Sequence, residues 1–264
     1  MTATLMESGT VVERTDVRRP GMGAALRSEW IKLTTVRSTW WTLAATFVLG
    51  AGLTVLLCWA NADWLASADA DESPGSFITW GMMIAQITAV VLGALVVTTE
   101  YGTGMIRTTF AAVPARGRVL AAKSVVVVAV LFVVGTVTAF VGYFGGNYFL
   151  DREGIGMSLE GDVLRAMYGS GLYLAGIGLF TVAVGFLLRH TAGTISIVLA
   201  LMLILGNMVN LVPGEFGEWL TKLMPGNAGS AISTPVSFNP NCWTPGPGSR
   251  CSGPRPPYSC CSPG

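Results

Sequence analysis

The feature that most limits the fold of this chain is a run of 21 residues, Trp40 to Ala60, without a charged side chain. A helix rises 1.5 Å per residue, so about 20 residues cross the roughly 30 Å hydrocarbon core of a bilayer. Similar apolar runs follow at about residues 77–99, 124–148, 166–188 and 191–212. Only 12% of the 264 residues are charged, against about 25% in a soluble domain. The sequence therefore predicts an all-α integral membrane protein with five recognisable transmembrane helices.

The basic residues alternate between the two sides of these spans. The first 39 residues carry six Lys or Arg residues, and the segment 100–123 carries four. The loop after the first span has none, but it holds the acids Asp63, Asp69, Asp71 and Glu72. Loops rich in Lys and Arg stay in the cytoplasm. We therefore expect a multi-pass protein of the cell membrane whose N-terminus, segment 100–123 and short turn at 189–190 are cytoplasmic.

The residues before the first span divide into two parts. Residues 1–21 are polar without helical periodicity, and we interpret them as a flexible cytoplasmic tail. Residues 22–39 place Leu26, Trp30 and Leu33 on one helical stripe, with charged residues on other faces. A helix of this composition suits the plane of the lipid headgroups. We expect an interfacial helix that connects to the first span, and a soluble amphipathic helix is the alternative.

A short basic segment, EYGTGMIRTTFAAVPARGRVLAAK at 100–123, separates the second and third spans. Gly102 and Gly104 give the backbone freedom to turn out of the span, and Pro114 ends a short helix because proline cannot continue it. The face of that helix that we interpret as apolar comprises Met105, Ile106, Thr109, Phe110, Ala112 and Val113. We expect this helix to dock into a groove of a partner. The alternative is an interfacial loop whose arginines only hold orientation.

This segment resembles the cytoplasmic loop of ABC-2 type transporter permeases. That loop reads E-Y-x-x-G-T-x-R, a short gap, and then R-x-x-x-x-x-x-K. The matching residues are Glu100, Tyr101, Arg107, Arg116 and Lys123. Gly102-Thr103-Gly104 in place of one Gly-Thr pair is a small departure.

Two other segments carry the same resemblance. The run R-S-E-W-I-K-L-T-T-V-R-S at 27–38 is similar to the N-terminal connecting helix of the family, and R-H-T-A-G at 189–193 is similar to its turn between spans four and five. The family has six spans, so the chain departs from it in lacking a recognisable sixth.

The resemblance implies that the chain is the membrane-spanning permease subunit of an ATP-driven ABC exporter. In that family two permeases pair as a dimer, and each binds an ABC ATP-binding subunit. The implied contacts with that subunit are Glu100, Tyr101, Gly102, Thr103, Arg107, Phe110, Arg116 and Lys123, with Arg27, Glu29, Trp30 and Lys32 in the connecting helix. ATP would act through the partner subunit, so no cofactor is expected on this chain. The alternative is a membrane-anchored accessory or structural protein without transport activity.

One near-match to a nucleotide-binding motif lies inside the basic segment. Gly117 to Ser124 approaches the phosphate-binding loop G-x-x-x-x-G-K-[ST], but Ala122 replaces the second glycine and no strand is predicted before it. We therefore expect no ATPase site here. Lys123 is predicted to extend toward the membrane surface at the start of the third span.

Other chemistry is scarce in the sequence. No Ser/His/Asp or paired-carboxylate set suggests an enzyme, and the single histidine, His190, suggests no metal site. The basic residues form no stripe that would bind nucleic acid. Gln86, Asn207 and Asn210 are polar residues within the spans, and we expect them either to hydrogen-bond between helices or to line a transport path. The small-residue pairs 142/146 and 171/175 permit close helix packing.

The C-terminal part has a different character. Residues 213–234 are broken by Gly and Pro, and we expect an extracellular or re-entrant segment. Residues 235–264 are rich in Pro and Cys. They fit either a disulfide-bonded tail or a frameshift. When the tail is read two bases out of frame, Cys242 and Cys260 become Leu and the translated segment becomes apolar. This favours the interpretation that a frameshift removed a sixth span.

Overall fold

The computed structural model describes residues 21–67, 74–112, 116–205, 208 and 233, and all regular structure among them is helical. The α-helices are α1 (Met22–Thr35), α2 (Arg37–Phe47), α3 (Leu53–Leu65), α4 (Pro74–Gly102), α5 (Met105–Ala112), α6 (Arg116–Arg152), α7 (Asp162–Leu188) and α8 (Thr191–Leu199). Two π-helical segments, η1 (Val48–Gly52) and η2 (Ala200–Leu205), continue α2 and α8.

Within the described residues, four helices are long and apolar enough to cross a membrane. The first joins α2, η1 and α3 into one helix, Arg37–Leu65, and the others are α4, most of α6, and α7. Each contains one predicted span, and each extends beyond it by several residues at one or both ends. The predicted fifth span is described only from 191 to 205 and at 208, where α8 and η2 form a shorter apolar helix.

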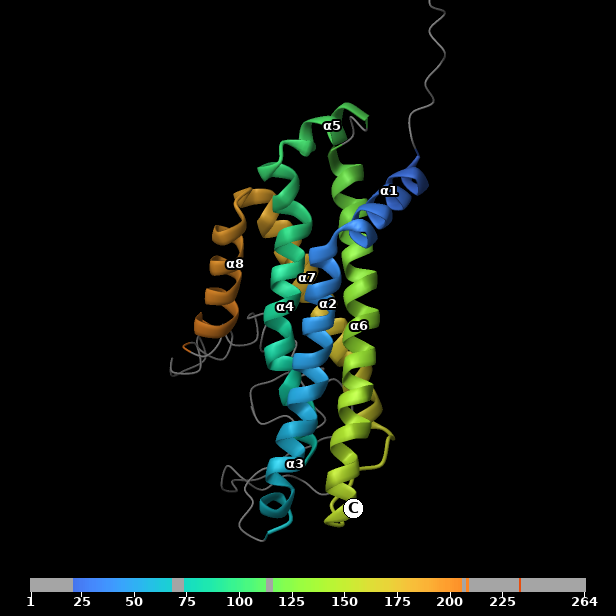
Figure 1. Cartoon of the computed structure of the whole chain (residues 1–264), viewed down its shortest axis with the longest axis vertical. Coiled ribbons are helices and arrows are strands. Elements are labelled where there is room, and N and C mark those ends of the chain that lie inside the picture. Colours follow the sequence, from blue (N-terminus) through green and yellow to red (C-terminus); the bar gives the residue numbers. More distant parts are fainter. Residues whose placement is uncertain (1–20, 68–73, 113–115, 206–207, 209–232, 234–264) are drawn as a thin grey trace, which may run out of the picture.

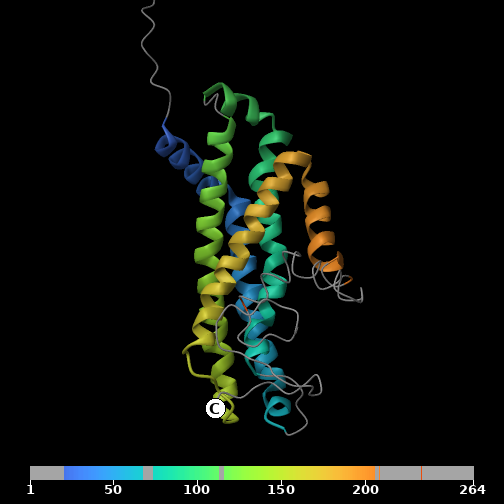
Figure 2. The same ribbon diagram turned by 180° about the vertical axis from the view of Figure 1, so that it is seen from behind.

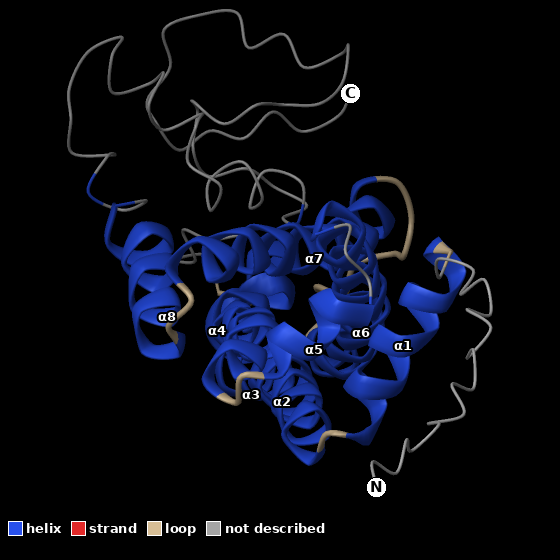
Figure 3. Cartoon of the chain, turned by 90° about the horizontal axis from the view of Figure 1, so that it is seen from above, coloured by secondary structure: helices blue, strands red, loops and turns tan. Residues whose placement is uncertain are grey.

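The four long helices run side by side along the long axis of the molecule (Figures 1 and 2). Helix α7 packs on α4 and α6, and α3 packs on α6 and α4. Helix α5 lies across one end of the bundle, between the ends of α4 and α6, and α1 leaves the same end at an angle. Seen from above, α1 and α8 lie on opposite sides (Figure 3).

Glycines allow the long helices to approach closely. Gly142 and Gly146 face α3, and a Cβ on Gly146 would lie 2.8 Å from Cys58 Sγ. On α7, a Cβ on Gly171 would overlap the Thr136 hydroxyl of α6. The prediction that these small-residue positions permit close packing is confirmed.

Two boundaries differ from the predictions. The connecting segment 22–39 is not one helix, because Val36 is extended (φ −82°, ψ 119°) and separates α1 from α2. The Trp40 indole N–H donates to the Thr34 carbonyl at 2.9 Å across this corner. The basic segment is also shorter than expected, since α4 continues to Gly102 and α6 begins at Arg116.

Some predictions lie outside the described residues. These are the polar tail over residues 1–20, the helix stop at Pro114, the two asparagines Asn207 and Asn210, the segment 213–234 except for Ser233, and the Pro- and Cys-rich tail.

Candidate functional site

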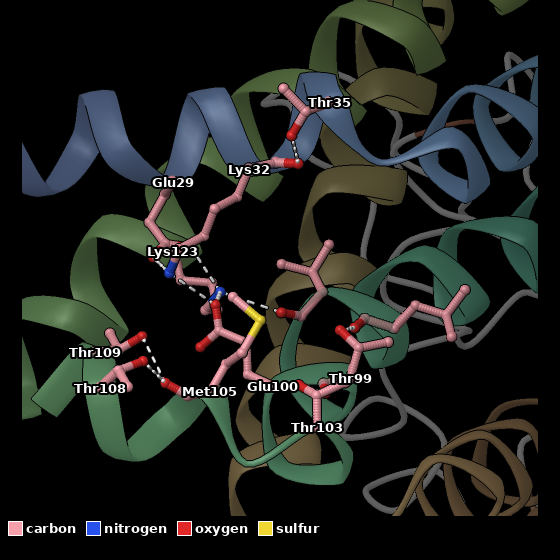
Figure 4. Close-up of polar contacts among 12 residues, drawn as sticks. Glu29, Lys32, Thr35, Thr99, Glu100, Thr103, Met105, Thr108, Thr109 and Lys123 are labelled. Atoms are coloured by element: carbon pink, nitrogen blue, oxygen red, sulfur yellow. Dashed lines mark hydrogen bonds and ion pairs between the residues drawn. The ribbon is translucent and has the colours of Figure 1, made fainter.

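Four charged side chains from three helices meet at the α5 end of the bundle (Figure 4). Glu29 and Lys32 come from α1, Glu100 from the last turn of α4, and Lys123 from the second turn of α6. The Lys123 ammonium lies 2.6 Å from Glu29 Oε2 and 3.0 Å from Glu100 Oε1. The Lys32 ammonium lies 2.8 Å from Glu29 Oε1 and 2.9 Å from Glu100 Oε1. We call these four residues the ionic cluster.

The ionic cluster is buried but electrically balanced. The side chain of Lys123 is 2% exposed, those of Glu29 and Glu100 are 6% and 7% exposed, and only Lys32 is more open, at 30%. Lys123 also donates to the Val96 carbonyl at 3.1 Å, so all three of its N–H groups have acceptors. Because buried charges are tolerated only when paired and hydrogen-bonded, these contacts fix α1 against α4 and α6.

The local sequence explains how α1 contributes two members. Ala25, Glu29 and Leu33 recur every four residues and form the buried face of α1. Lys32 follows Glu29 by three residues, so its side chain reaches the same carboxylate from the edge of that face. Burial opposes the positive charge on Lys32, but hydrogen bonds and the charges of Glu29 and Glu100 outweigh it and raise the lysine pKa above its usual value.

A second set of contacts joins the end of α4 to the turn between α7 and α8. The Tyr101 ring packs edge-to-face on Phe186, with centroids 6.1 Å apart. The Arg189 guanidinium carbon lies 5.6 Å from the centroid of the Tyr101 ring. Arg189 has the left-handed conformation (φ 56°) that ends α7. Arg107 and Arg189 both line a polar pocket of about 750 Å³ beside this ring.

The remaining predicted contact residues whose side chains are described lie on the surface. Gly102, Thr103 and Arg107 are exposed, as are Arg27 and Trp30 on α1. The side chains of Phe110 and Arg116 lie outside the described set.

Glu29, Glu100 and Lys123 are directed inward, so they are not open to contact with another subunit. The prediction that Lys123 extends to the membrane surface is wrong, because two carboxylates lie within 3.0 Å of its ammonium.

The near-match to a phosphate-binding loop takes a different structure. Gly117 to Ser124 lies in the first turns of α6. Beyond the first turn, the backbone N–H groups of a helix are used in its own hydrogen bonds. Lys123, which would contact a phosphate in such a loop, is instead held by the ionic cluster.

Gln86 and His190 each make a defined hydrogen bond. Tyr173 of α7 donates a hydrogen bond from its hydroxyl to Gln86 Oε1 of α4, so Gln86 does link two helices. His190 accepts a hydrogen bond from the Gly193 backbone N–H at 3.2 Å and thereby caps α8. No group of three or more His, Cys, Asp or Glu residues able to hold a metal occurs among the described residues.

The pairing within the ionic cluster could not be read from the sequence, although all four members were among the predicted contact residues. Glu29 and Lys123 are 94 positions apart, and Glu100 and Lys123 are 23 apart. The available signal was the scarcity of charge: an acid that ends one span and a base that begins the next must find partners if both are buried.

Comparison with family models, with curated proteins and with solved structures gave no match.

Proposed function

We propose that this protein is the membrane-spanning permease subunit of an ATP-driven exporter, with ATP hydrolysed by a separate ATP-binding subunit. The observation that carries the proposal is the ionic cluster, which joins α1 to the ends of α4 and α6 directly beside the short helix α5. Such a connection between three helices suits the place where a conformational change of a soluble partner is transmitted to a membrane domain. The resemblance of segments 27–38 and 100–123 to ABC-2 type permeases supports the same function.

In this proposal the exposed and the buried residues have different roles. Gly102, Thr103 and Arg107 present an exposed surface to the ATP-binding subunit, and Arg27 and Trp30 extend it along α1. Glu29, Glu100 and Lys123 position these two surfaces relative to each other. Gly104 (φ 73°) makes the turn that leads from α4 into α5, and buried Ile106 holds α5 against the bundle.

The proposal includes an orientation and partners. The α5 end faces the cytoplasm, because the loops rich in Lys and Arg lie there, and α1 lies in the plane of the headgroups. A second permease copy or a homologue completes a dimer in the cell membrane.

The test is charge reversal at Arg107. The tagged chain is co-expressed with any ATP-binding protein whose gene adjoins its own, and co-purification and ATP hydrolysis are measured. We expect Arg107→Glu to insert normally in the membrane but to lose most of the bound ATP-binding subunit, because an exposed cation that faces a partner has become an anion. Arg152→Glu, at the other end of α6, is the matched control and should bind as the wild type does.

Two results would contradict the proposal. One is unchanged co-purification and ATPase stimulation by well-expressed Arg107→Glu. The other is the absence of any co-purifying ATP-binding protein with the wild-type chain, which would favour the accessory-protein alternative.

A further inference from the structure

The polar pocket of about 750 Å³ lies where the end of α4, the start of α5 and the turn between α7 and α8 meet. Helices α7 and α8 both contact α4, and the turn between them lies near the end of α4 (Figures 1 and 2). The pocket contains two cationic side chains, Arg107 of α5 and Arg189 of the turn. We call it the arginine pocket. Its volume is within the roughly 300–1,000 Å³ typical of small-molecule sites.

The two positive charges of the arginine pocket are not balanced by the described residues around them. Each guanidinium group is permanently charged and carries five N–H donors. Within the part of the chain that the structure describes, neither group has a carboxylate or hydrogen-bond partner, and no acidic residue lines the pocket. Glu100, the acid closest to Arg107 in sequence, is bound by the lysines of the ionic cluster. The arginine pocket therefore suits an anion.

One of the two guanidinium groups is held in position by an aromatic ring. The Arg189 guanidinium carbon lies 5.6 Å from the centroid of the Tyr101 ring, which is itself packed edge-to-face on Phe186. The attraction of a cation to the face of a ring is electrostatic, so it takes up no oxygen acceptor. The N–H groups of Arg189 that do not face the ring stay available to a ligand.

The position of the arginine pocket along the helices matches the lipid headgroups. Arg189 directly follows the apolar run 166–188, and Tyr101 follows the run 77–99 by two residues. The hydrocarbon core ends where such runs end, and Tyr is enriched at this boundary. Leu187 and Leu188, directly before Arg189, are 80% and 36% exposed. An apolar surface therefore leads up to the pocket from the membrane.

We propose that the arginine pocket binds the phosphate group of an anionic membrane lipid. The paired N–H donors of a guanidinium group match two oxygens of a phosphate, and Arg107 and Arg189 line the same pocket. Basic pockets between membrane helices on the cytoplasmic side are a known mode of binding for anionic headgroups. The acyl chains contact Leu187 and Leu188. The inference does not depend on the chain being an exporter subunit.

Charge distinguishes this lipid from the other sources of a phosphate group. Phosphatidylglycerol brings one net negative charge to the two arginines. Phosphatidylcholine has the same phosphate, but it also brings an ammonium group that the arginines repel. Free glycerol phosphate has the charge and lacks the acyl chains, so it gains nothing from the exposed leucines.

The experiment is native mass spectrometry of the full chain in a neutral detergent, without any ATP-binding subunit. Phosphatidylglycerol, phosphatidylcholine and glycerol phosphate are titrated in turn, and the bound copies are counted by mass. We expect one copy of phosphatidylglycerol to bind before any other. Phosphatidylcholine should bind at least about tenfold more weakly, and glycerol phosphate should displace phosphatidylglycerol only at a concentration at least about tenfold higher.

Two charge variants connect the binding to the pocket. Arg189→Gln removes a charged donor and should weaken the binding of phosphatidylglycerol by at least about tenfold. Arg189 lies outside the segments assigned to the ATP-binding subunit, so this result is independent of the proposed function. Arg37→Gln is the matched control, because Arg37 is exposed at the start of α2 and does not line the pocket. It should change the affinity by no more than about twofold at physiological salt, where separated surface charges are screened.

A third variant keeps both charges and fills the space. Gly102 lines the arginine pocket, and no atom lies within 4 Å of a Cβ added there. Gly102→Trp should therefore fold and should also weaken the binding by at least about tenfold, since the indole takes the place of the headgroup. It tests the proposal even if Arg189→Gln does not fold.

Four outcomes would overturn the proposal. Equal losses for Arg189→Gln and Arg37→Gln would mean general attraction to a basic surface. Unchanged binding by Gly102→Trp would place the lipid elsewhere. Equal binding of the two lipids would remove the role of charge. Displacement by glycerol phosphate at the concentration at which phosphatidylglycerol binds would make a soluble phosphate the ligand.

Discussion

Replacing Lys123 by methionine should be the most destabilising single change in the ionic cluster. Methionine has a similar length and no charge, so the substitution removes the ammonium with little loss of volume. It removes three hydrogen bonds, at 2.6, 3.0 and 3.1 Å. Glu29 and Glu100 then share only Lys32, which leaves one excess negative charge in the buried site.

The structure sets the size of the effect. Removing one partner of a buried ion pair costs about 3–5 kcal/mol, because the remaining charge stays buried without compensation. Lys123, at 2% side-chain exposure, belongs to this class. Lys32 contacts the same two carboxylates but is 30% exposed, so water partly solvates it. Lys32→Met also leaves one excess negative charge on the two buried carboxylates, but water can enter on the open side where Lys32 stood, so we expect a smaller cost, about 1.5–3 kcal/mol.

The two methionine variants therefore form a matched pair. Both can be unfolded in mixed micelles by titration with SDS, with tryptophan fluorescence as the signal. The prediction is a larger loss for Lys123→Met than for Lys32→Met by about 1 kcal/mol or more. Equal losses, or a larger loss for Lys32→Met, would refute the assignment of Lys123 as the centre of the cluster.

A double variant tests whether the cost comes from unpaired charge. Adding Glu29→Gln to Lys123→Met leaves Lys32 and Glu100 as a neutral pair 2.9 Å apart. The loss in the double variant should be smaller than the sum of the two single losses by about 0.5–3 kcal/mol. Simple additivity would mean that the two side chains do not interact in the folded protein.

Three further predictions concern other contacts. Gly81→Ala should destabilise the protein by about 1–3 kcal/mol, because the added Cβ would overlap a backbone oxygen of η1. Gly176→Ala has no atom within 4 Å of the added Cβ, so it should be neutral or stabilising by up to about 1 kcal/mol. Thermal unfolding of the two variants compares their stabilities. Tyr173→Phe removes the hydroxyl that bonds to Gln86. It should lower the stability by about 0.6 kcal/mol, the average for such hydrogen bonds between membrane helices. SDS titration measures the loss, and an unchanged stability would show that this hydrogen bond does not stabilise the fold. The folded-state pKa of Lys32 is raised, so its contribution to stability is complete below the usual lysine pKa of about 10.4 and is lost as the pH rises through the higher folded value. The stability difference between wild type and Lys32→Met should accordingly shrink only at strongly alkaline pH, and a difference that shrinks near neutral pH would contradict this.

The positions of the long helices could be predicted from the sequence because their signal is local. An uncharged run of about 20 residues is sufficient to identify a membrane-spanning helix, and the four long helices each contain such a run. The helix ends were less predictable. The sequence predicts boundaries at Glu100 and Lys123 because these residues are charged, yet α4 continues to Gly102 and α6 already begins at Arg116.

These misplaced ends and the cluster have the same physical cause. A charged residue ends an apolar run only when its charge must reach water. Glu100 and Lys123 bond to each other at 3.0 Å and to the side chains of α1, so their charges are neutralised inside the protein. That pairing depends on the packing of α1 against α4 and α6, which local sequence periodicity does not specify.

The arrangement of these helices also limits how α1 can move in the proposed exporter. Separating α1 from α4 and α6 would expose or strand the charges of Glu29 and Lys123, at a cost of several kcal/mol. Helix α5 is joined through the chain to α4 on one side and to α6 on the other. A load applied by a partner to either α1 or α5 therefore reaches the same residues, Glu100 and Lys123. The three helices at this end should therefore respond as one unit.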